Sequence, residues 1–413
     1  MPGENLPDSK THAPGTEAHR DRSTALRFVV LIGILSFFAD FTYEGSRSIV
    51  GPFLATLQAN SFTVGVVAGL GELLGYGLRL VSGRLADRTR RFWPITIAGY
   101  VVQMSSVPLL ALAGNWPVAA ALIVLERVGK ATRNPPRDVM LSHAASQIGG
   151  FGWAFGLHEA LDQLGALFGP LAVAGVLLLR GDYRVAFAAL ALPAVINLGL
   201  VLAARLLYPT PEKMEAPLAA ETATRLPPVF WIYLAGAVLV AAGFADFPLI
   251  AYHFAKGSSV SVRFVPVFYA VAMGLSGTGS LLFGRLFDQF GFVVLIVLTI
   301  CTTLFAPLAF LGGFWGGLVG MALWGIGMGV HESIIPAAVA PMVAADRRAS
   351  AYGLFTAGYG IFWFLGSAAL GFLYGVSVPA LVVTSMILQL SAVPFFLVVA
   401  RKRSSIRGRG ANA

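Results

Sequence analysis

Charged side chains are scarce in this chain of 413 residues, since Asp, Glu, Lys and Arg make up only 12% of it. A soluble domain carries roughly 25% charged residues, so this chain has too few to coat a surface that faces water. Apolar residues make up 57%, which also excludes a disordered chain, because disorder requires low hydrophobicity. The composition therefore excludes a soluble globular enzyme and predicts an integral membrane protein.

Cysteine and the common catalytic motifs are also missing. The single cysteine, Cys301, lies in the apolar run VLTICTTLF and permits neither an intrachain disulfide nor a cysteine-based metal site. The sequence contains no H-E-x-x-H, no G-x-S-x-G, no Walker loop and no G-x-G-x-x-G after a strand. We therefore expect no cofactor, no metal site and no enzymatic activity, and we expect gradients of ions or solutes to supply any energy.

Long apolar runs fill most of the chain, and each is long enough for a spanning helix of about 20 residues. Residues 1–25 are polar and contain no apolar core of a cleavable signal peptide, so the first run is expected to be the first span. The twelve predicted spans are residues 26–56, 62–82, 92–113, 116–140, 151–179, 184–206, 229–255, 264–284, 291–313, 315–341, 350–374 and 378–400.

The spans predict two six-helix bundles, at residues 26–206 and 229–400, joined by a polar linker at 207–228. A polar tail, 1–25, and a basic tail, 401–413, complete the chain. The net charge is +9, but the basic residues mostly flank apolar runs, which argues against a nucleic-acid partner. Their concentration on one side predicts that both termini, both tails and the linker are cytoplasmic, in a plasma or inner membrane.

The two halves of the chain repeat each other in order. The sequence FADF recurs, at 38–41 and 244–247, and Gly83-Arg-Leu-Ala-Asp87 recurs as Gly284-Arg-Leu-Phe-Asp288. Phe155-Gly-Leu157 likewise matches Tyr352-Gly-Leu354. Repeated halves around a site at the membrane midplane are the plan of many secondary transporters, so the repeat predicts a solute transporter.

The run GRLADRTRR, residues 83–91, resembles the signature between spans two and three of the major facilitator superfamily, and GRLFDQFG resembles its second copy. Span five is similar to that family's antiporter motif at Gly156, Gly165, Gly169 and Pro170. The resemblance implies two pseudo-symmetric bundles that work by alternating access, and we expect a functional monomer. Two departures are Val173-Ala174 for the motif's final Gly-Gly, and Arg90 for a glycine, which predicts a different turn there.

In the family that the loop signature resembles, the aspartate holds the two halves closed on the cytoplasmic side. The resemblance therefore implies a gating role for Asp87. The alternative is a solvated loop of mixed charge with topological value only. The residues of the predicted gating motif are Gly83, Asp87, Arg88, Arg91, Gly284 and Asp288.

Ionisable residues lie within the predicted spans, where each buried charge costs a few kcal/mol and needs a function or a partner. Most are in the first half and fall near the middle of their spans, which predicts a polar cavity at the midplane. The alternative is a set of static ion pairs. The predicted substrate and proton-coupling residues are Asp40, Glu44, Arg47, Glu72, Glu126, Arg127, Lys130, Asp162 and Asp246.

Spacing adds detail to these charges. Asp40, Glu44 and Arg47 share one helical face, as do Glu126 and Lys130, and one acid of the first group is left incompletely neutralised, so it can carry a proton. The prolines at 135–136 are expected to break or bend span four.

We therefore expect a secondary transporter in contact with membrane lipid that exchanges protons for a small amphipathic or organic-ion solute. One alternative is proton-coupled uptake of an organic anion, with Arg127 and Lys130 as counter-charges. From another class, the chain could be a membrane-embedded enzyme or a receptor.

Overall fold

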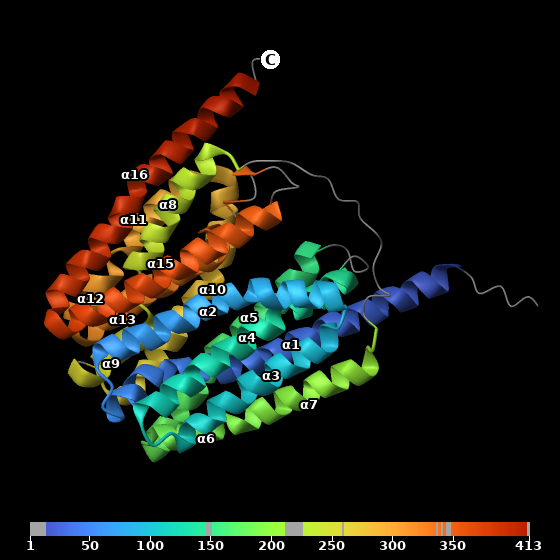
Figure 1. Ribbon diagram of the computed structural model, residues 1–413, viewed down its shortest axis with the longest axis horizontal. Helices are drawn as coiled ribbons and strands as arrows, with labels where there is room; N and C mark the ends of the chain where they lie inside the picture. The colour runs from blue at the N-terminus through green and yellow to red at the C-terminus, as the bar shows by residue number, and fades with distance from the viewer. Residues whose placement is uncertain are drawn as a thin grey trace, which may run out of the picture.

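The computed structural model describes residues 14–145, 151–210, 226–257, 260–335, 338–339, 342–343 and 348–410. The described chain is almost entirely helical. The first half contains α1 (Pro14–Thr56), α2 (Ser61–Thr89), α3 (Phe92–Leu109), the short η1 (Leu110–Leu112), α4 (Trp116–Ala145), α5 (Phe151–Arg180), α6 (Tyr183–Ala189) and α7 (Ala191–Leu207). Figure 1 shows these helices, in blue to green, as one group beside the second half.

The second half, yellow to red in Figure 1, forms the other group of helices. It contains α8 (Pro228–Gly243), α9 (Phe247–Gly257), η3 (Val262–Phe264), α10 (Val265–Phe290), α11 (Phe292–Thr302), α12 (Phe305–Leu311), α13 (Gly313–Gly329), η4 (Val330–Ile334), α15 (Arg348–Val376) and α16 (Val378–Gly410). We call the far end the one where α1 meets α2 at residues 57–60, and the near end the one where α2 meets α3 at residues 90–91.

Eleven helical segments among the described residues are long and apolar enough to cross a membrane. The remaining span is α4, which has the length, 30 residues, but carries the charged run ERVGKATRNPPRD. Together they give the predicted twelve-span, all-helical architecture. The predicted linker lies mostly outside the described residues, as do residues 1–13 of the N-terminal tail.

Several predicted spans are interrupted, and two predicted tails are partly helical. The sixth, seventh and ninth spans each consist of two helices, α6 with α7, α8 with α9, and α11 with α12. The helices α1 and α16 extend into the tails, to Pro14 and Gly410. Of the predicted break or bend at Pro135 and Pro136, the break does not occur, because α4 continues through both prolines to Ala145.

The break between α8 and α9 fixes the position of a buried acid. The indole of Trp324 donates to the carbonyl oxygen of Ala245 at 2.8 Å, and Ser385 donates to that of Gly243 at 2.6 Å. Buried carbonyl groups outside a helix need such partners. Residues 244–246 therefore cross the interior without regular helix, and Asp246, which directly precedes α9, is only 2% exposed.

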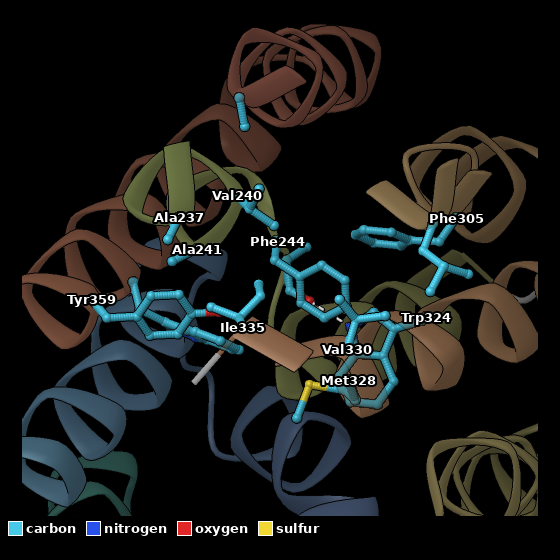
Figure 2. Packing of buried hydrophobic residues seen from close by; sticks show 14 of the residues in the cluster. Ala237, Val240, Ala241, Phe244, Phe305, Trp324, Met328, Val330, Ile335 and Tyr359 are labelled. Atoms are coloured by element: carbon cyan, nitrogen blue, oxygen red, sulfur yellow. Dashed lines mark hydrogen bonds between the residues drawn. The ribbon is translucent and has the colours of Figure 1, made fainter. Parts of the chain in front are cut away.

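Aromatic residues surround this break in the core of the second half. Figure 2 shows Phe244 between Phe305 and Trp324, with ring centroids 4.9 Å and 5.7 Å away. Such pairs add about 0.5–1.5 kcal/mol each beyond their buried area. The aromatic packing therefore holds the unwound segment, and Asp246 with it, in one conformation.

The two halves pack closely at the far end. A Cβ atom added to Gly51 would lie 2.0 Å from the backbone oxygen of Pro248, and one added to Gly65 would lie 2.3 Å from that of Ser367. The hydroxyl of Tyr252 in α9 also donates to the carbonyl of Ala59 at 3.3 Å. Glycine allows backbones to approach closely between membrane helices, so the described conformation is closed at the far end.

The signature loop at the near end is mostly helix. Residues 83–89 form the last two turns of α2, and only Arg90 and Arg91 separate it from α3. The prediction of a different turn is wrong, because Arg90 itself takes the left-handed conformation, φ 53° and ψ 19°, that glycine favours. Gly291, after the repeated motif, also has a positive φ of 62°.

Replacing Arg90 with glycine is expected to stabilise the protein, because a left-handed conformation costs a non-glycine residue roughly 1–2 kcal/mol, partly offset by the greater entropy of unfolded glycine. Thermal unfolding of purified protein should show a small rise in Tm. As the matched control, Arg88→Gly lies in the helical last turn and should lower Tm. A fall in Tm for Arg90→Gly would show that its side chain is needed.

Candidate functional site

The predicted intramembrane charges of α1 and α4 meet in the interior of the first half. The carboxylate of Asp40 lies 3.5 Å from Lys130 Nζ and 3.5 Å from a guanidinium nitrogen of Arg133. Both Asp40 and Arg133 are buried. Because a buried ion is costly unless it is paired, α4 supplies the counter-charges that the acid of α1 needs.

Arg47 connects the two halves. Its guanidinium lies 3.3 Å from Glu72 of α2, 3.3 Å from Asp246 of the second half and 4.0 Å from Glu44 of its own helix. The other carboxylate oxygen of Asp246 accepts hydrogen bonds from Trp363 and Ser367 of α15, each at 3.0 Å. A single buried cation is thus shared by three acids from both halves.

Glu44 makes a second connection between the halves. The hydroxyl of Tyr269 in α10 donates a hydrogen bond to its carboxylate. The ring of Tyr269 packs against Phe247, with centroids 4.1 Å apart, so the aromatic core of the second half orients the donor.

Arg127 and Glu126, adjacent in α4, face different partners. Arg127 lies 2.8 Å from Glu72 and 3.7 Å from Glu126. Glu126 accepts a hydrogen bond from the amide of Gln103 in α3 at 2.8 Å, and the amide oxygen of Gln103 accepts one from Arg133 at 2.6 Å. Lys130, one helical turn after Glu126, forms its ion pair with Asp40.

Tyr43 lies among the cations. Its ring centroid is 3.9 Å from Lys130 Nζ, 4.8 Å from the guanidinium carbon of Arg127 and 6.0 Å from that of Arg47. Cations are attracted to the face of an aromatic ring by about 0.5–2 kcal/mol when desolvated. Tyr43 therefore helps to hold three like charges in one small volume.

The network has an uneven charge balance. Nine ionisable side chains belong to it, and the acids outnumber the cations by one: Asp40, Glu44, Glu72, Glu126 and Asp246 against Arg47, Arg127, Lys130 and Arg133. One bound proton makes the set neutral. An uncompensated charge in a low-dielectric interior is costly.

Asp162 and its neighbour on α5 lie apart from these ion pairs. Oδ1 of Asp162 is buried and has no hydrogen-bond partner in the described part of the chain. His158, one turn away, instead bonds to Ser36 of α1 at 2.7 Å, and Arg137 donates to the same serine at 3.1 Å. The structure thus joins eight of the nine predicted coupling residues and leaves Asp162 beside them.

The antiporter-like motif packs α5 against α1. A Cβ atom added to Gly165 would lie 2.3 Å from the backbone oxygen of Phe37, and one added to Gly169 would lie 2.2 Å from that of Phe41. Gly156 is near the start of α5, and Pro170 lies inside it. These glycines bring the backbone of α5 next to the segment of α1 that bears Asp40 and Glu44.

The residues of the predicted gating motif lie at the near end. Gly83, Asp87 and Arg88 are in the last turns of α2, and Gly284 and Asp288 are in those of α10. Arg91 precedes α3. The side chains of both aspartates are outside the described part of the structure, so the gating role of Asp87 stays a prediction.

Sequence analysis missed the uncharged partners of the network. Gln103, Tyr269, Trp363 and Ser367 each bond to one of its carboxylates. The sequence contains one usable signal, because Gln103 is an amide within an apolar run and such a group needs a partner in lipid. The other three are common packing residues, and only the tertiary contacts reveal them.

Spanning helices in two repeated halves, joined through buried charges, define a multi-pass membrane transporter of the secondary type. The chain belongs to the Major Facilitator Superfamily, whose family model matches residues 31–367.

Two relatives were compared with this chain, and the description of the second carries the same assignment. The uncharacterized protein Rv2265 of Mycobacterium tuberculosis is 44% identical over 382 residues, which cover 91% of this chain and 93% of the relative. A protein from Methanocaldococcus jannaschii described as an uncharacterized MFS-type transporter is 31% identical over 141 residues, 34% of this chain and 35% of its own.

Solved structures show the same fold at low sequence identity. The nucleoside transporter NupG superposes with a TM-score of 0.67 at 15% identity, over 92% of this chain and 98% of its own. A bacterial homolog of the human lysosomal transporter Spinster, in an inward-facing and occupied conformation, gives 0.68 at 17% identity, over 92% and 97%. The peptide transporter POT in complex with sulfate gives 0.70 at 13% identity, over 92% and 95%.

Proposed function

We propose that this transporter exchanges protons for a small amphipathic or organic-ion solute, which it exports across the plasma or inner membrane. Both termini are then cytoplasmic, the far end faces outwards, and a monomer is the working unit. The observation that carries the proposal is the contact of Arg47 with both Glu72 and Asp246, because it joins the halves through groups that can be protonated.

Opening the far end requires α1 to separate from α9, and this separation must break the contact between Arg47 and Asp246. A neutral carboxylic acid attracts a guanidinium much less than a carboxylate does. A proton on Asp246 or Glu72 therefore weakens the connection and favours the conformation open at the far end. This gives proton binding a differential effect on two states, which coupling requires.

The near end contributes the other gate in this proposal. Asp87 and Arg88 in α2, with Asp288 in α10, would hold the halves together when the far end is open. Their position in the last turns of two repeated helices supports such a role, because a rocking motion brings the same ends of both halves together.

The test is flux in inside-out vesicles, with a panel of amphipathic cations and organic anions as probes. An acidified lumen should drive accumulation of an exported solute, since the lumen corresponds to the outside. We expect Asp246→Asn and Glu72→Gln to lose this dependence on the pH gradient by about tenfold or more, within the usual range of coupling free energies. Asp40→Asn and Glu44→Gln test the remaining acids of α1.

Asp182→Asn is the matched control, because Asp182 is an exposed cap of α6 and asparagine caps a helix equally well. It should keep wild-type coupling. Solute that leaves an acidified lumen together with protons would instead establish uptake by symport, with Arg127 and Lys130 as counter-charges for an anion. An absence of flux for every probe, with turnover of a lipid substrate, would favour a membrane-embedded enzyme.

A further inference from the structure

A small cavity lies within the first half, on the far side of the charged network. Its volume is about 30 Å³. Tyr43, Arg47, Glu126 and Arg127 line one part of it, and a single residue, Pro248, comes from the second half. The rest of the wall is mainly apolar: Ser46, Val50, Leu54, Val64, Val67, Ala68, Leu110 and Ile123.

The cavity extends towards the far-end turns. Leu54 is in the last turn of α1, Val64 is in the first turn of α2, and Leu110 begins η1 after α3. The charged part of the wall comes from residues further inside these helices. The cavity therefore lies between the far end and the charged network, mainly inside the first bundle, with Pro248 of the second half in its wall.

Two polar atoms of the cavity wall lack partners. The hydroxyl of Tyr43 and Nε of Arg47 are buried and have no hydrogen-bond partner among the described residues. Tyr43 and Arg47 are only 3% and 7% exposed. A buried polar group without a partner costs about 1–3 kcal/mol, and native proteins satisfy most such groups with a protein partner or with ordered water.

The cavity has the size and chemistry for water. A buried water needs about 10–15 Å³ of free space and two to four polar partners. The volume is sufficient for one or two water molecules. Tyr43 and Arg47 can donate hydrogen bonds to such waters, and Tyr43 and Glu126 can accept hydrogen bonds from them.

Of the described residues that line this cavity, Glu126 alone has a carboxylate. Gln103 fixes one of its oxygens, and Arg127 lies 3.7 Å from the other. The surrounding elements bring few further charges: Lys130 and Arg133 of α4 itself, Arg47 of α1 and Glu72 of α2, with the phenols of Tyr43 and Tyr100. Glu126 is thus held at the inner end of the cavity.

We propose that this cavity is a hydrated chamber through which protons from the far end reach Glu126, along a route separate from the path of the solute between the halves. A hydronium ion in the chamber transfers a proton to the Glu126 carboxylate, which becomes a neutral acid, and a water molecule remains. Gln103 acts as a positioning residue that aims the carboxylate. This inference rests on the proton coupling in the proposed function.

Infrared difference spectroscopy of the protein in lipid nanodiscs tests the chamber without a known solute. A pH titration should reveal a protonated carboxyl band that Glu126→Gln removes. After mixing with D2O, Ala68→Leu, which fills the chamber, should slow the isotopic shift of this band by about tenfold. Ala68→Val makes the same test with a smaller side chain. The matched control, Ala121→Leu, lies on an exposed face of α4 and should exchange as the wild type does.

A band that persists in Glu126→Gln would overturn the assignment of the acid. Exchange at the wild-type rate in correctly folded Ala68→Leu and Ala68→Val would overturn the chamber, even if vesicle flux remained coupled to protons. Conversely, solute flux that does not depend on the pH gradient would refute the proposed coupling. The chamber would still stand if the Glu126 band were present and Ala68→Leu slowed its isotopic shift. The two failures are therefore distinguishable.

Discussion

Arg47→Ala is expected to abolish coupled transport and to lower the free energy of unfolding by about 3–5 kcal/mol, the usual cost of removing one partner from buried ion pairs. The substitution leaves Glu44, Glu72 and Asp246 without the cation that they share. No other described cation is within ion-pair distance of Glu44 or Asp246, so the loss cannot be shared among neighbours. Vesicle flux and thermal unfolding measure the two effects.

Two further variants separate charge from general damage. Arg47→Lys keeps the charge but loses the planar fork that contacts several carboxylates at once, so it should keep part of the stability and little of the coupling. Arg263→Ala removes an exposed arginine at the far end and should change neither property. Wild-type flux in Arg47→Ala would show that the network is a static support and that the pH dependence arises elsewhere.

Gly51→Leu is expected to prevent the far end from closing and to reduce flux by about 100-fold or more, because overpacking a tight contact forces backbone shifts. A Cβ atom at this position would already lie 2.0 Å from the backbone oxygen of Pro248 and 3.0 Å from the amide nitrogen of Tyr252. Backbone atoms cannot move aside as the end of a side chain can. The halves should therefore stay separated where α1 meets α9.

Spin labels at Thr56 of α1 and Arg263 of η3, which both line a cavity at the far end, measure this separation in a Cys301→Ser background. Gly51→Leu should shift the distribution towards longer distances, with the helical content unchanged. Gly175→Leu is the matched control, because a Cβ atom at Gly175 in α5 has no neighbour within 4 Å. A closed far end in Gly51→Leu, with full flux, would contradict the view that α1 and α9 form a gate.

Arg47→Ala and Gly51→Leu both act on the closing of the far end, by different means. Arg47→Ala removes the attraction that holds the far end closed, and Gly51→Leu adds a repulsion there. Both should favour the conformation open at the far end, but only Arg47→Ala removes ion pairs whose strength depends on protonation of Glu72 and Asp246. Distances between the same labels at two pH values therefore separate a gate from a coupling residue.

The membrane architecture could be predicted because it depends on length and composition. Each span needs enough apolar residues to cross the lipid, and the repeated sequences at Asp40 and Asp246 revealed the two halves. Spacing in α1 also placed Asp40, Glu44 and Arg47 on one face of the helix. These are properties of single helices, and a sequence records them directly.

Local rules failed where contacts between helices compete with them. Pro135 and Pro136 do not end α4, and Arg90 accepts a left-handed conformation that sequence rules reserve for glycine. In the same way, spacing placed Glu126 and Lys130 on one face of α4 but did not reveal that Lys130 contacts Asp40. Local rules describe single segments, so they do not fix these outcomes.

By itself, the sequence determined that this is a twelve-span, repeated membrane protein with most of its intramembrane ionisable residues in its first half, because hydrophobicity and charge are properties of each segment. Only the tertiary structure decided which charges meet: Arg47 with Asp246, Glu126 with Gln103, and Tyr43 beside a cavity. Coulomb attraction and hydrogen bonding act over a few ångströms, and distances that short between helices remote in the sequence are fixed only by folding.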